Sequence, residues 1–218
     1  TAILKLNKHP FPAKIDGVVE ELFDYAAPEM NLPFKILFAN RWLTNWLLLR
    51  QLSNAPASNA MVRTTVAPTI IEGGFQENVL PSQVSATINL RILPGETTAS
   101  VKDYLEKVID DNRVSISKIG DFTKNPSFVS PTNSFGFQTI QKTILEVFPG
   151  VVVAPSLVVA GTDSRHYKNV SKNIYRFLPV KLAKEDLGRI HGINERISVE
   201  NYKQAIRFYK QLMVNSTK

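Results

Sequence analysis

The feature that most constrains this fold is a strict alternation of apolar and polar residues between Val84 and Ile92. Alternation over that length is typical of a strand with one buried face. The preceding segment is rich in Val, Thr and Ile, which favour strands, and Gly73-Gly74 ends it. Helical spacing follows, then a short strand pattern. The order β-β-α-β predicts a small antiparallel sheet with a helix on one face. The predicted elements are strands at 62–71, 84–92 and 114–117 and a helix at 98–109.

The first sixty residues are predicted to be mostly helical. Apolar residues recur there at helical spacing, and Pro10 and Pro12 stop the first helix. In the longest helix, Trp42 and Trp46 are four residues apart and therefore share a face. We expect this very apolar helix either to meet a hydrophobic acyl chain or membrane, or to pack against the sheet. The predicted helices cover 1–8, 16–25 and 34–52, with a loop at 54–59.

The last third of the chain has a different pattern. Residues 151–160 form an almost continuous apolar run, which fits a strand buried on both faces of an α/β sheet. A second strand at 174–178 gives only two, too few for a stable sheet. We therefore expect further strands from before Thr1, since the chain starts without Met and reads there like the middle of a helix. Helices are predicted at 134–148 and 199–214, and a domain boundary at 119–133.

Composition narrows the class of protein. The 218 residues are 44% hydrophobic and 21% charged, ordinary values for a globular protein, which excludes a disordered tail or a coiled coil. No apolar run reaches the ~18 residues that a transmembrane helix needs. The chain has no Cys, which excludes disulfides and Cys-zinc sites and fits either redox compartment. The net charge of +7 is scattered, without the basic stripe of a nucleic-acid-binding protein, so we expect no nucleic acid partner.

Two histidines in the last third are candidates for a site. His166 follows the predicted buried strand and the Gly161-Thr162-Asp163 loop, and ligands gather at the carboxyl ends of strands in open α/β sheets. His191 precedes a dense polar cluster. Either a zinc ligand or a hydrogen-bonded structural His fits this pattern. No His-x-His, His-x-Asp or His-Glu-x-x-His pair is present, so the spacing shows no complete metal site.

The predicted sheet offers a second candidate. Asn78 lies in the turn between two strands, and Arg91 ends the alternating strand. At one end of a sheet, an Arg fork and an Asn amide would make a clamp for a carboxylate or carbonyl. A turn Asn and a surface Arg at a strand end are the interpretation that the residues by themselves favour. Glu20-Glu21 is interpreted as solvated helix surface, and no Gly-x-Ser-x-Gly nucleophile elbow occurs.

Five segments in order along the chain resemble one known family. They are Thr64–Thr69, Gly73–Pro81 and Asn89–Gly95 in the first part, and Gly161–Tyr167 and His191–Ser198 in the second. The first three resemble the lid, or dimerisation, domain of the dizinc aminoacylase/carboxypeptidase family. The other two resemble the C-terminal part of its catalytic domain. The branch of carboxypeptidase S and the secreted N-fatty-acyl-amino-acid hydrolases is the most similar.

The resemblance implies an α/β (α+β) fold and a metallopeptidase activity. A ferredoxin-like lid domain would cover residues 1–122, without its N-terminal strand, and the end of an α/β zinc-exopeptidase domain would cover 123–218. Two zinc ions per subunit would serve hydrolysis of dipeptides or N-acyl amino acids next to a free carboxylate, with a homodimer formed through the lid. The implied roles are His191 as zinc ligand, Asn78 and Arg91 as lid residues that reach substrate, and Gly161, Thr162 and Arg165 as the loop that holds the substrate carboxylate.

The chain departs from the family in what it lacks. The other zinc ligands, the general-base Glu and the lid Gly-His-Ser-Ser motif of the family precede the region that this chain matches. The sequence therefore predicts that the chain by itself is inactive, with no catalytic residue of its own. The alternative is a non-catalytic dimerisation or binding module.

Overall fold

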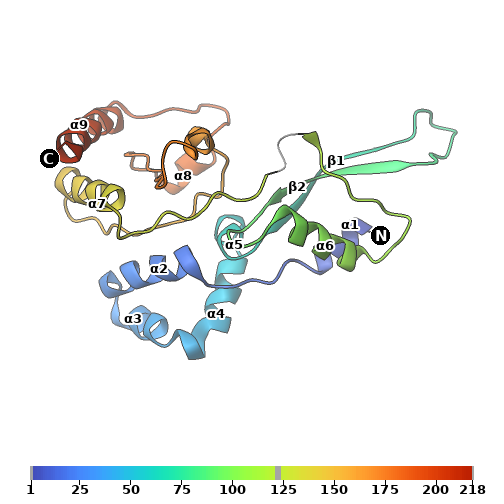
Figure 1. The fold of residues 1–218 in the computed structure, drawn as a ribbon, viewed down its shortest axis with the longest axis horizontal. Helices are drawn as coiled ribbons and strands as arrows, with labels where there is room; N and C mark the ends of the chain where they lie inside the picture. The colour runs from blue at the N-terminus through green and yellow to red at the C-terminus, as the bar shows by residue number, and fades with distance from the viewer. Residues whose placement is uncertain (1, 121–123, 218) are drawn as a thin grey trace. The chain divides into compact units, whose positions relative to one another are not determined.

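The computed structural model describes residues 2–120 and 124–217, which form two compact units (Figure 1). Unit 1 is the chain up to Glu21 together with Leu32–Val129, and unit 2 is Leu22–Asn31 together with the chain from Ser130 onward. The domain boundary predicted between residues 122 and 123 falls outside the described residues. No described helix is both long and apolar enough to cross a membrane.

Unit 1 contains an antiparallel hairpin of β1 (Thr65–Gly73) and β2 (Val84–Arg91). The register runs from Thr65 opposite Arg91 to Gly73 opposite Val84, with an irregularity between Pro68 and Ile70. Pro68 has no N–H to give to the ladder, and such residues are confined to edges and bulges. The two predicted strands are confirmed, with β1 starting three residues later than expected.

The third predicted strand, at 114–117, is wrong. The sheet of the described residues has two strands, and residues 114–117 pair with neither. Ile116 instead packs against the hydrophobic core of unit 1. A short alternating run becomes a strand only where a neighbouring edge accepts its hydrogen bonds.

The core of unit 1 lies between α6 (Thr98–Ile109), α1 (Ala2–Lys8) and the hairpin. The helix α6 has the predicted bounds. A capping box starts it: the Ser100 N–H donates to Thr97 Oγ1 over 3.1 Å, and the Thr97 N–H donates to Ser100 Oγ over 3.0 Å. The buried side chains are Leu6, Phe11, Val101, Leu105 and Ile109.

The helical part between α1 and the hairpin differs from the prediction in two places. The single helix expected over 34–52 is wrong, because the chain breaks at Asn40 into α3 (Leu32–Ala39) and α4 (Arg41–Ser53). The loop expected at 54–59 is also wrong, because α5 (Pro56–Val62) occupies it. Proline in the first turn of α5 costs no hydrogen bond, since the N–H groups there have no partner in the helix. The helix α2 (Gly17–Ala26) was predicted.

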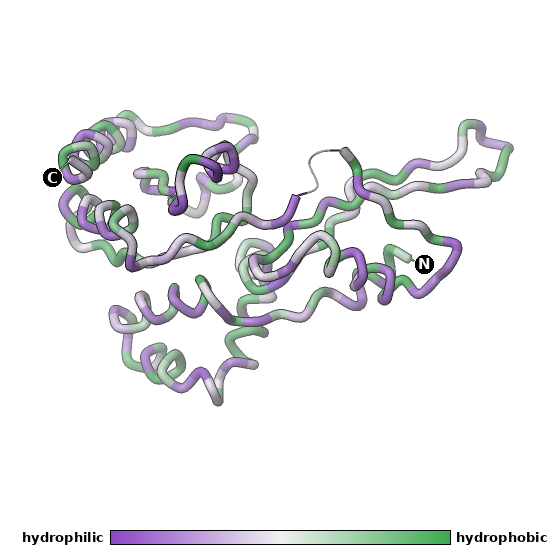
Figure 2. Tube along the Cα trace, viewed as in Figure 1, coloured by the Kyte–Doolittle hydropathy of each residue, from purple (hydrophilic) through white to green (hydrophobic). Residues whose placement is uncertain are grey.

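Unit 2 is built on the packing of α7 (Phe135–Val147) against α9 (Val199–Ser216). Both helices were predicted, and Figure 2 shows hydrophobic and hydrophilic residues interleaved along them. Phe208 is 1% exposed and contacts the rings of Phe148 and Phe177 at centroid distances of 6.4 and 4.9 Å. The short helices η3 (Asp163–Tyr167) and α8 (Lys184–Leu187) come between α7 and α9 in the sequence.

The two strands predicted in unit 2 are wrong as secondary structure. Residues 151–160 and 174–178 carry no strand in the described chain. Val152 is exposed, whereas Pro155 is buried, so the run is not covered along its length. A strand buried on both faces needs a hydrogen-bonded neighbour, and no described segment pairs with either run.

Candidate functional site

The clearest polar cluster in unit 2 is built around the loop that enters η3. Thr162 occupies the N-cap position, and its Oγ1 lies 2.6 Å from Ser164 Oγ. The Nε of Arg176 reaches both hydroxyls, at 3.1 Å to Thr162 Oγ1 and 2.7 Å to Ser164 Oγ. The guanidinium therefore ties the 162–164 turn to the extended segment that carries Arg176.

Two further basic side chains follow in the same turn. The Nε of Arg165 donates to Nε2 of His166 over 3.2 Å, and both side chains are exposed. Guanidinium groups beside hydroxyl groups suit a carboxylate, which accepts charge-assisted hydrogen bonds in a planar geometry. A carboxylate would fit this chemistry, and the role expected for Thr162 and Arg165 stays a prediction.

Gly161 precedes this cluster, and packing inside the unit does not require glycine there. A Cβ built on Gly161 would meet nothing within 4 Å. Its role is thus not explained by close packing among the described residues. Its predicted part in holding substrate stays a prediction.

Arg176 and Ser164 were missed in the sequence analysis. The available signal was an Arg inside the otherwise apolar run Ile174–Leu178, which was interpreted only as a strand. Arg176 is twelve residues from Ser164 in the chain, and spacing alone does not reveal such a contact.

His191 lies in an exposed turn with unusual backbone geometry. Its φ is 59°, and Asn194 has a φ of 62°. This left-handed region is uncommon for residues other than Gly, and such outliers concentrate at functional loops. The polar segment that follows His191 is thus an exposed turn with two residues in the left-handed backbone region.

The metal expected from the family does not fit the donors described here. Zinc sites use three or four protein ligands. Among residues 2–120 and 124–217, no group of three or more His, Cys, Asp or Glu gathers that could hold a metal ion. His191 is a single donor, so its role as a zinc ligand stays a prediction.

Asn78 and Arg91 are placed apart by the hairpin. Asn78 is exposed in the connection beyond the Gly73–Val84 pair, whereas Arg91 pairs with Thr65 at the other end. The seven residue steps from Val84 to Arg91 span about 24 Å at ~3.4 Å per step. The expectation that both lie at one end of the sheet is wrong, because a hairpin puts its turn and the end of its second strand one strand length apart.

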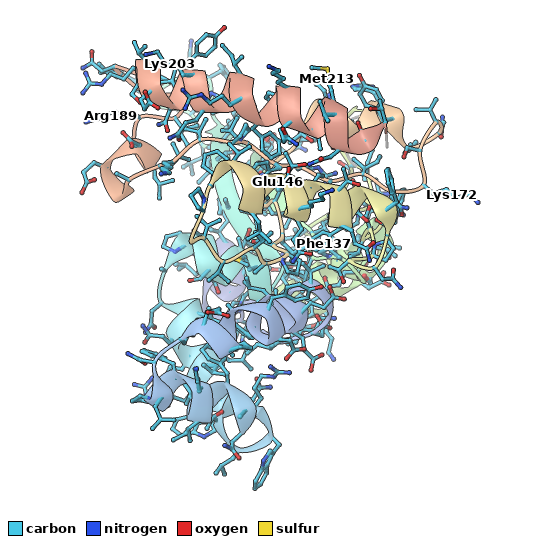
Figure 3. All side chains as sticks on the ribbon, turned by 90° about the vertical axis from the view of Figure 1, so that its left-hand side faces the viewer. Phe137, Glu146, Lys172, Arg189, Lys203 and Met213 are labelled. Carbon is cyan, nitrogen blue, oxygen red and sulfur yellow. The ribbon has the colours of Figure 1, made fainter. Side chains whose placement is uncertain are left out.

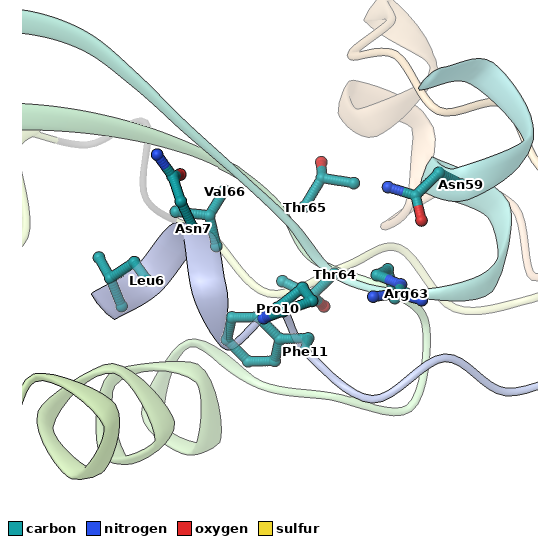
Figure 4. Close-up of a pocket in the computed structure, with 9 residues that line it drawn as sticks. All are labelled: Leu6, Asn7, Pro10, Phe11, Asn59, Arg63, Thr64, Thr65 and Val66. Carbon is teal, nitrogen blue, oxygen red and sulfur yellow. The ribbon is translucent and has the colours of Figure 1, made fainter. Parts of the chain in front are cut away.

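A small cavity of about 140 Å³ lies elsewhere in unit 1, between α1, α5 and the start of β1 (Figure 4). Its wall includes Asn59, Arg63 and Thr64. The Arg63 side chain donates to Ser53 Oγ over 2.9 Å, and Asn59 Oδ1 is buried without a hydrogen-bond partner. None of the predicted site residues lines this cavity.

One strongly shifted pKa lies outside the candidate site. Arg113 holds the pKa of the Asp111 carboxyl well below its usual range through hydrogen bonds of 2.9 and 2.7 Å to the two carboxylate oxygens. The pair is a surface turn that follows α6. Its geometry explains the shift without a catalytic role.

Residues 3–116 match the family described as a peptidase dimerisation domain, of the M20 class. The chain belongs to this family. It is 44% identical over 217 residues to a carboxypeptidase S-like protein of Dictyostelium discoideum, covering 100% of this chain and 41% of the relative. It is 42% identical to the N-fatty-acyl-amino acid synthase/hydrolase PM20D1 of Xenopus tropicalis, covering 99% of this chain and 42% of the relative.

Solved structures share the fold. An M20 family metallo-carboxypeptidase from Sulfolobus solfataricus superposes with a TM-score of 0.57 at 15% identity, over 97% of this chain and 51% of that one. Human carnosine dipeptidase 1 gives the same TM-score and identity over 98% of this chain and 48% of that one. The chain thus spans about two fifths of the curated relatives and about half of these structures.

Proposed function

We propose that this chain is the part of a metal-dependent exopeptidase or N-acyl-amino-acid hydrolase that binds the free carboxylate of the substrate. The observation that carries the proposal is similarity along the whole chain to relatives named for those activities. Unit 1 acts as the lid and dimerisation domain and unit 2 as the end of the catalytic domain. Metal ligands and a general base come from a longer protein of the relatives' length, because His191 is one donor.

The cluster around Thr162 supports the carboxylate-binding role. Arg176 holds Thr162 and Ser164 through one nitrogen, and Arg165 stands next in the turn. The cations of Arg165 and Arg176 beside two hydroxyls favour an anionic group over an amide, although the turn also carries Asp163. A free carboxylate beside the scissile amide is the anionic group that carboxypeptidases and N-acyl-amino-acid hydrolases have in common.

The activity test is amide hydrolysis followed by mass spectrometry on a panel of dipeptides and N-acyl amino acids. The 218-residue chain is compared with a protein that carries it within the length of the curated relatives, each with zinc and with chelator. Activity of the longer, zinc-loaded protein alone would support the proposal. Activity of neither would favour the alternative, a non-catalytic dimerisation or binding module.

The carboxylate role is tested separately in the longer protein. Arg165→Gln should raise KM about ten- to hundredfold, which is the cost of losing a hydrogen bond to a charged group. For substrates with an amidated C-terminus, wild type and variant should have the same KM. Arg207→Gln, an exposed Arg on α9, is the matched control and should leave KM unchanged. An equal rise in KM for amidated substrates would contradict the assignment.

A further inference from the structure

The helical hairpin α3–α4 in unit 1 exposes an unusual amount of apolar surface. The two helices contact each other and meet at Asn40 (Figure 1). Their inner side is buried through Phe38 and Leu48. The exposed residues, named here the α3–α4 patch, are Phe34, Ile36, Trp42, Leu43, Trp46 and Leu47.

The patch is held by a rigid corner. Thr44 Oγ1 donates to the carbonyl oxygen of Leu37 over 2.7 Å and lies 3.0 Å from that of Asn40. The side-chain Nδ2 of Asn40 donates to the carbonyl oxygen of Ile36 over 2.8 Å. Because these bonds fix the turn between the helices, the outward side chains do not fold back onto the inner side.

On α4 the exposed residues form one stripe. Trp42 and Trp46 are 83% and 65% exposed and lie one turn apart, with Leu43 and Leu47 beside them. Arg50 follows one turn after Trp46 on the same side. Tryptophan side chains are enriched where proteins meet the membrane–water interface, and cations beside them reach the headgroups.

The chain segment that carries the patch contains basic residues and no acidic ones, and Glu20 of the neighbouring helix α2 approaches it at Arg41. Residues 30–71 contain no Asp or Glu, and they include four cations, which account for +4 of the chain's net charge of +7. Lys35 stands between Phe34 and Ile36, and Arg50 ends the α4 stripe. Arg41 also contacts Glu20, at 3.4 Å. Basic residues beside an apolar surface are complementary to the phosphates and carboxylates of anionic lipids.

We propose that the α3–α4 patch docks on the surface of an anionic lipid membrane. The two tryptophans and their neighbouring aliphatic residues enter the boundary between headgroups and acyl chains, while Lys35 and Arg50 contact the headgroup charges. In this arrangement α3 and α4 lie on the membrane surface. This inference is independent of any hydrolase activity.

The test uses vesicles of equimolar phosphatidylcholine and phosphatidylserine, with pure phosphatidylcholine vesicles as the comparison. Trp42 and Trp46 are the only two tryptophans of the chain, so intrinsic fluorescence reports on the patch directly. We expect co-sedimentation with the anionic vesicles, a blue shift of the emission, and quenching by brominated acyl chains. Binding should weaken as salt is added, because screening shortens the range of the charges.

Matched variants distinguish binding through the α3–α4 patch from non-specific binding of the protein to vesicles. Trp42→Ala should lower the partition coefficient at least about tenfold, from the apolar area that it removes. Phe75→Ala is the control, since Phe75 is also 83% exposed but lies after β1. Lys35→Gln with Arg50→Gln should lower binding about fivefold for each charge, whereas Lys107→Gln with Lys210→Gln, two exposed lysines of α6 and α9, should not.

Four outcomes would overturn the proposal. The first is absence of binding to anionic vesicles by wild-type protein with its native far-UV circular dichroism spectrum. The second is equal loss of binding in Phe75→Ala. The third is a blue shift that depends on protein concentration without lipid, which would make the patch an interface between two copies. The fourth is loss of vesicle binding in a protein of the relatives' length, which would mean that the rest of that protein covers the patch.

Discussion

The two units of this molecule are stabilised in different ways, unit 1 by strand pairing and unit 2 by helix packing. In unit 1, β1 and β2 are consecutive strands, joined by residues 74–83, and they pair with each other in an antiparallel ladder. In unit 2, the apolar run 151–160 and the segment 174–178 carry no strand, and stability comes from two helices packed through aromatic rings. The difference shows that a hairpin is specified by adjacent sequence, whereas a strand buried on both faces depends on partners that local sequence does not supply.

The largest expected effect tests whether unit 2 depends on its helix pair. Phe208→Ala removes the most buried aromatic ring of the α7–α9 core and should lower the free energy of unfolding by about 3–5 kcal/mol. Hydrogen exchange read by mass spectrometry should show the loss of protection in α7 and α9. Figure 3 shows these two helices side by side, with Glu146 on α7 and Met213 on α9.

The control for Phe208→Ala is Tyr202→Ala on the same helix. Tyr202 is exposed, and such substitutions change stability by no more than about 0.5 kcal/mol. If Phe208→Ala exposes the amides of β1 and β2 equally, the two units unfold as one, and the contrast between them fails as a description of stability.

A smaller effect is expected at the junction of the hairpin and α6 in unit 1. Thr64 is buried, and its Oγ1 accepts from the Leu93 N–H over 2.9 Å while it donates to Glu96 Oε2 over 2.9 Å. Thr64→Val keeps the shape but leaves the Leu93 N–H without its acceptor, which should cost about 1–3 kcal/mol. Urea denaturation measures the change.

Thr69→Val is the matched substitution within β1. Thr69 is exposed, and its hydroxyl is 3.3 Å from the Thr87 carbonyl oxygen. It should change stability by less than about 0.5 kcal/mol. Equal losses of unfolding free energy at Thr64 and Thr69 would show that the buried junction is no more important for unit 1 than the exposed surface of β1.

These contrasts also explain which elements could be predicted. The helices with a capping residue and regular apolar spacing, α6 and α9, began at the expected residues because both signals are local. The break at Asn40 was missed, because it depends on hydrogen bonds from Asn40 and Thr44 to carbonyl oxygens of α3, and hydropathy does not report such bonds.

In the candidate site, too, residues in a contiguous motif could be predicted, whereas contacts between distant segments could not. Thr162 and Arg165 could be proposed from a contiguous motif, and they share one turn. Arg176 was missed because its contacts with that turn cross a dozen residues of irregular chain. Asn78 and Arg91 do not meet at one end of the sheet, because the hairpin register separates the turn from the strand end. Their role in reaching substrate stays a prediction.

A third, smaller effect compares the N-terminal caps of one helix in each unit. Thr97→Ala removes one half of the reciprocal capping box of α6 and should lower the free energy of unfolding by about 1 kcal/mol. Ser198→Ala removes the single cap of α9, where Ser198 Oγ accepts from the Asn201 N–H over 3.1 Å. We expect a loss of similar size there, since each substitution removes one hydrogen bond from a backbone N–H to the capping hydroxyl. Thr97→Ser should restore the stability of unit 1, and failure to do so would assign the loss to the methyl group instead of the cap.

The smallest expected effect is the pH dependence of the Asp111–Arg113 pair in unit 1. Hydrogen bonds from Arg113 lower the pKa of Asp111 in the folded chain. A carboxyl with a depressed folded pKa contributes stability above its unfolded pKa of about 3.9, and this contribution is lost as the pH falls through the folded pKa. Asp111→Asn should therefore lower Tm slightly at neutral pH and flatten the acid side of the Tm profile.

The exposure of the pair keeps this effect small, because solvent screens the attraction between the two groups. Added salt should reduce the difference between wild type and Asp111→Asn, whereas it should leave the cost of Phe208→Ala unchanged, since burial of an aromatic ring carries no charge. A salt-independent difference at Asp111 would mean that the short hydrogen bond from the Arg113 guanidinium to Oδ2, which an Asn amide NH2 cannot accept, matters more than the charge. The backbone hydrogen bond from the Arg113 N–H to Oδ1 does not distinguish the two proteins, because the Asn side chain keeps that acceptor.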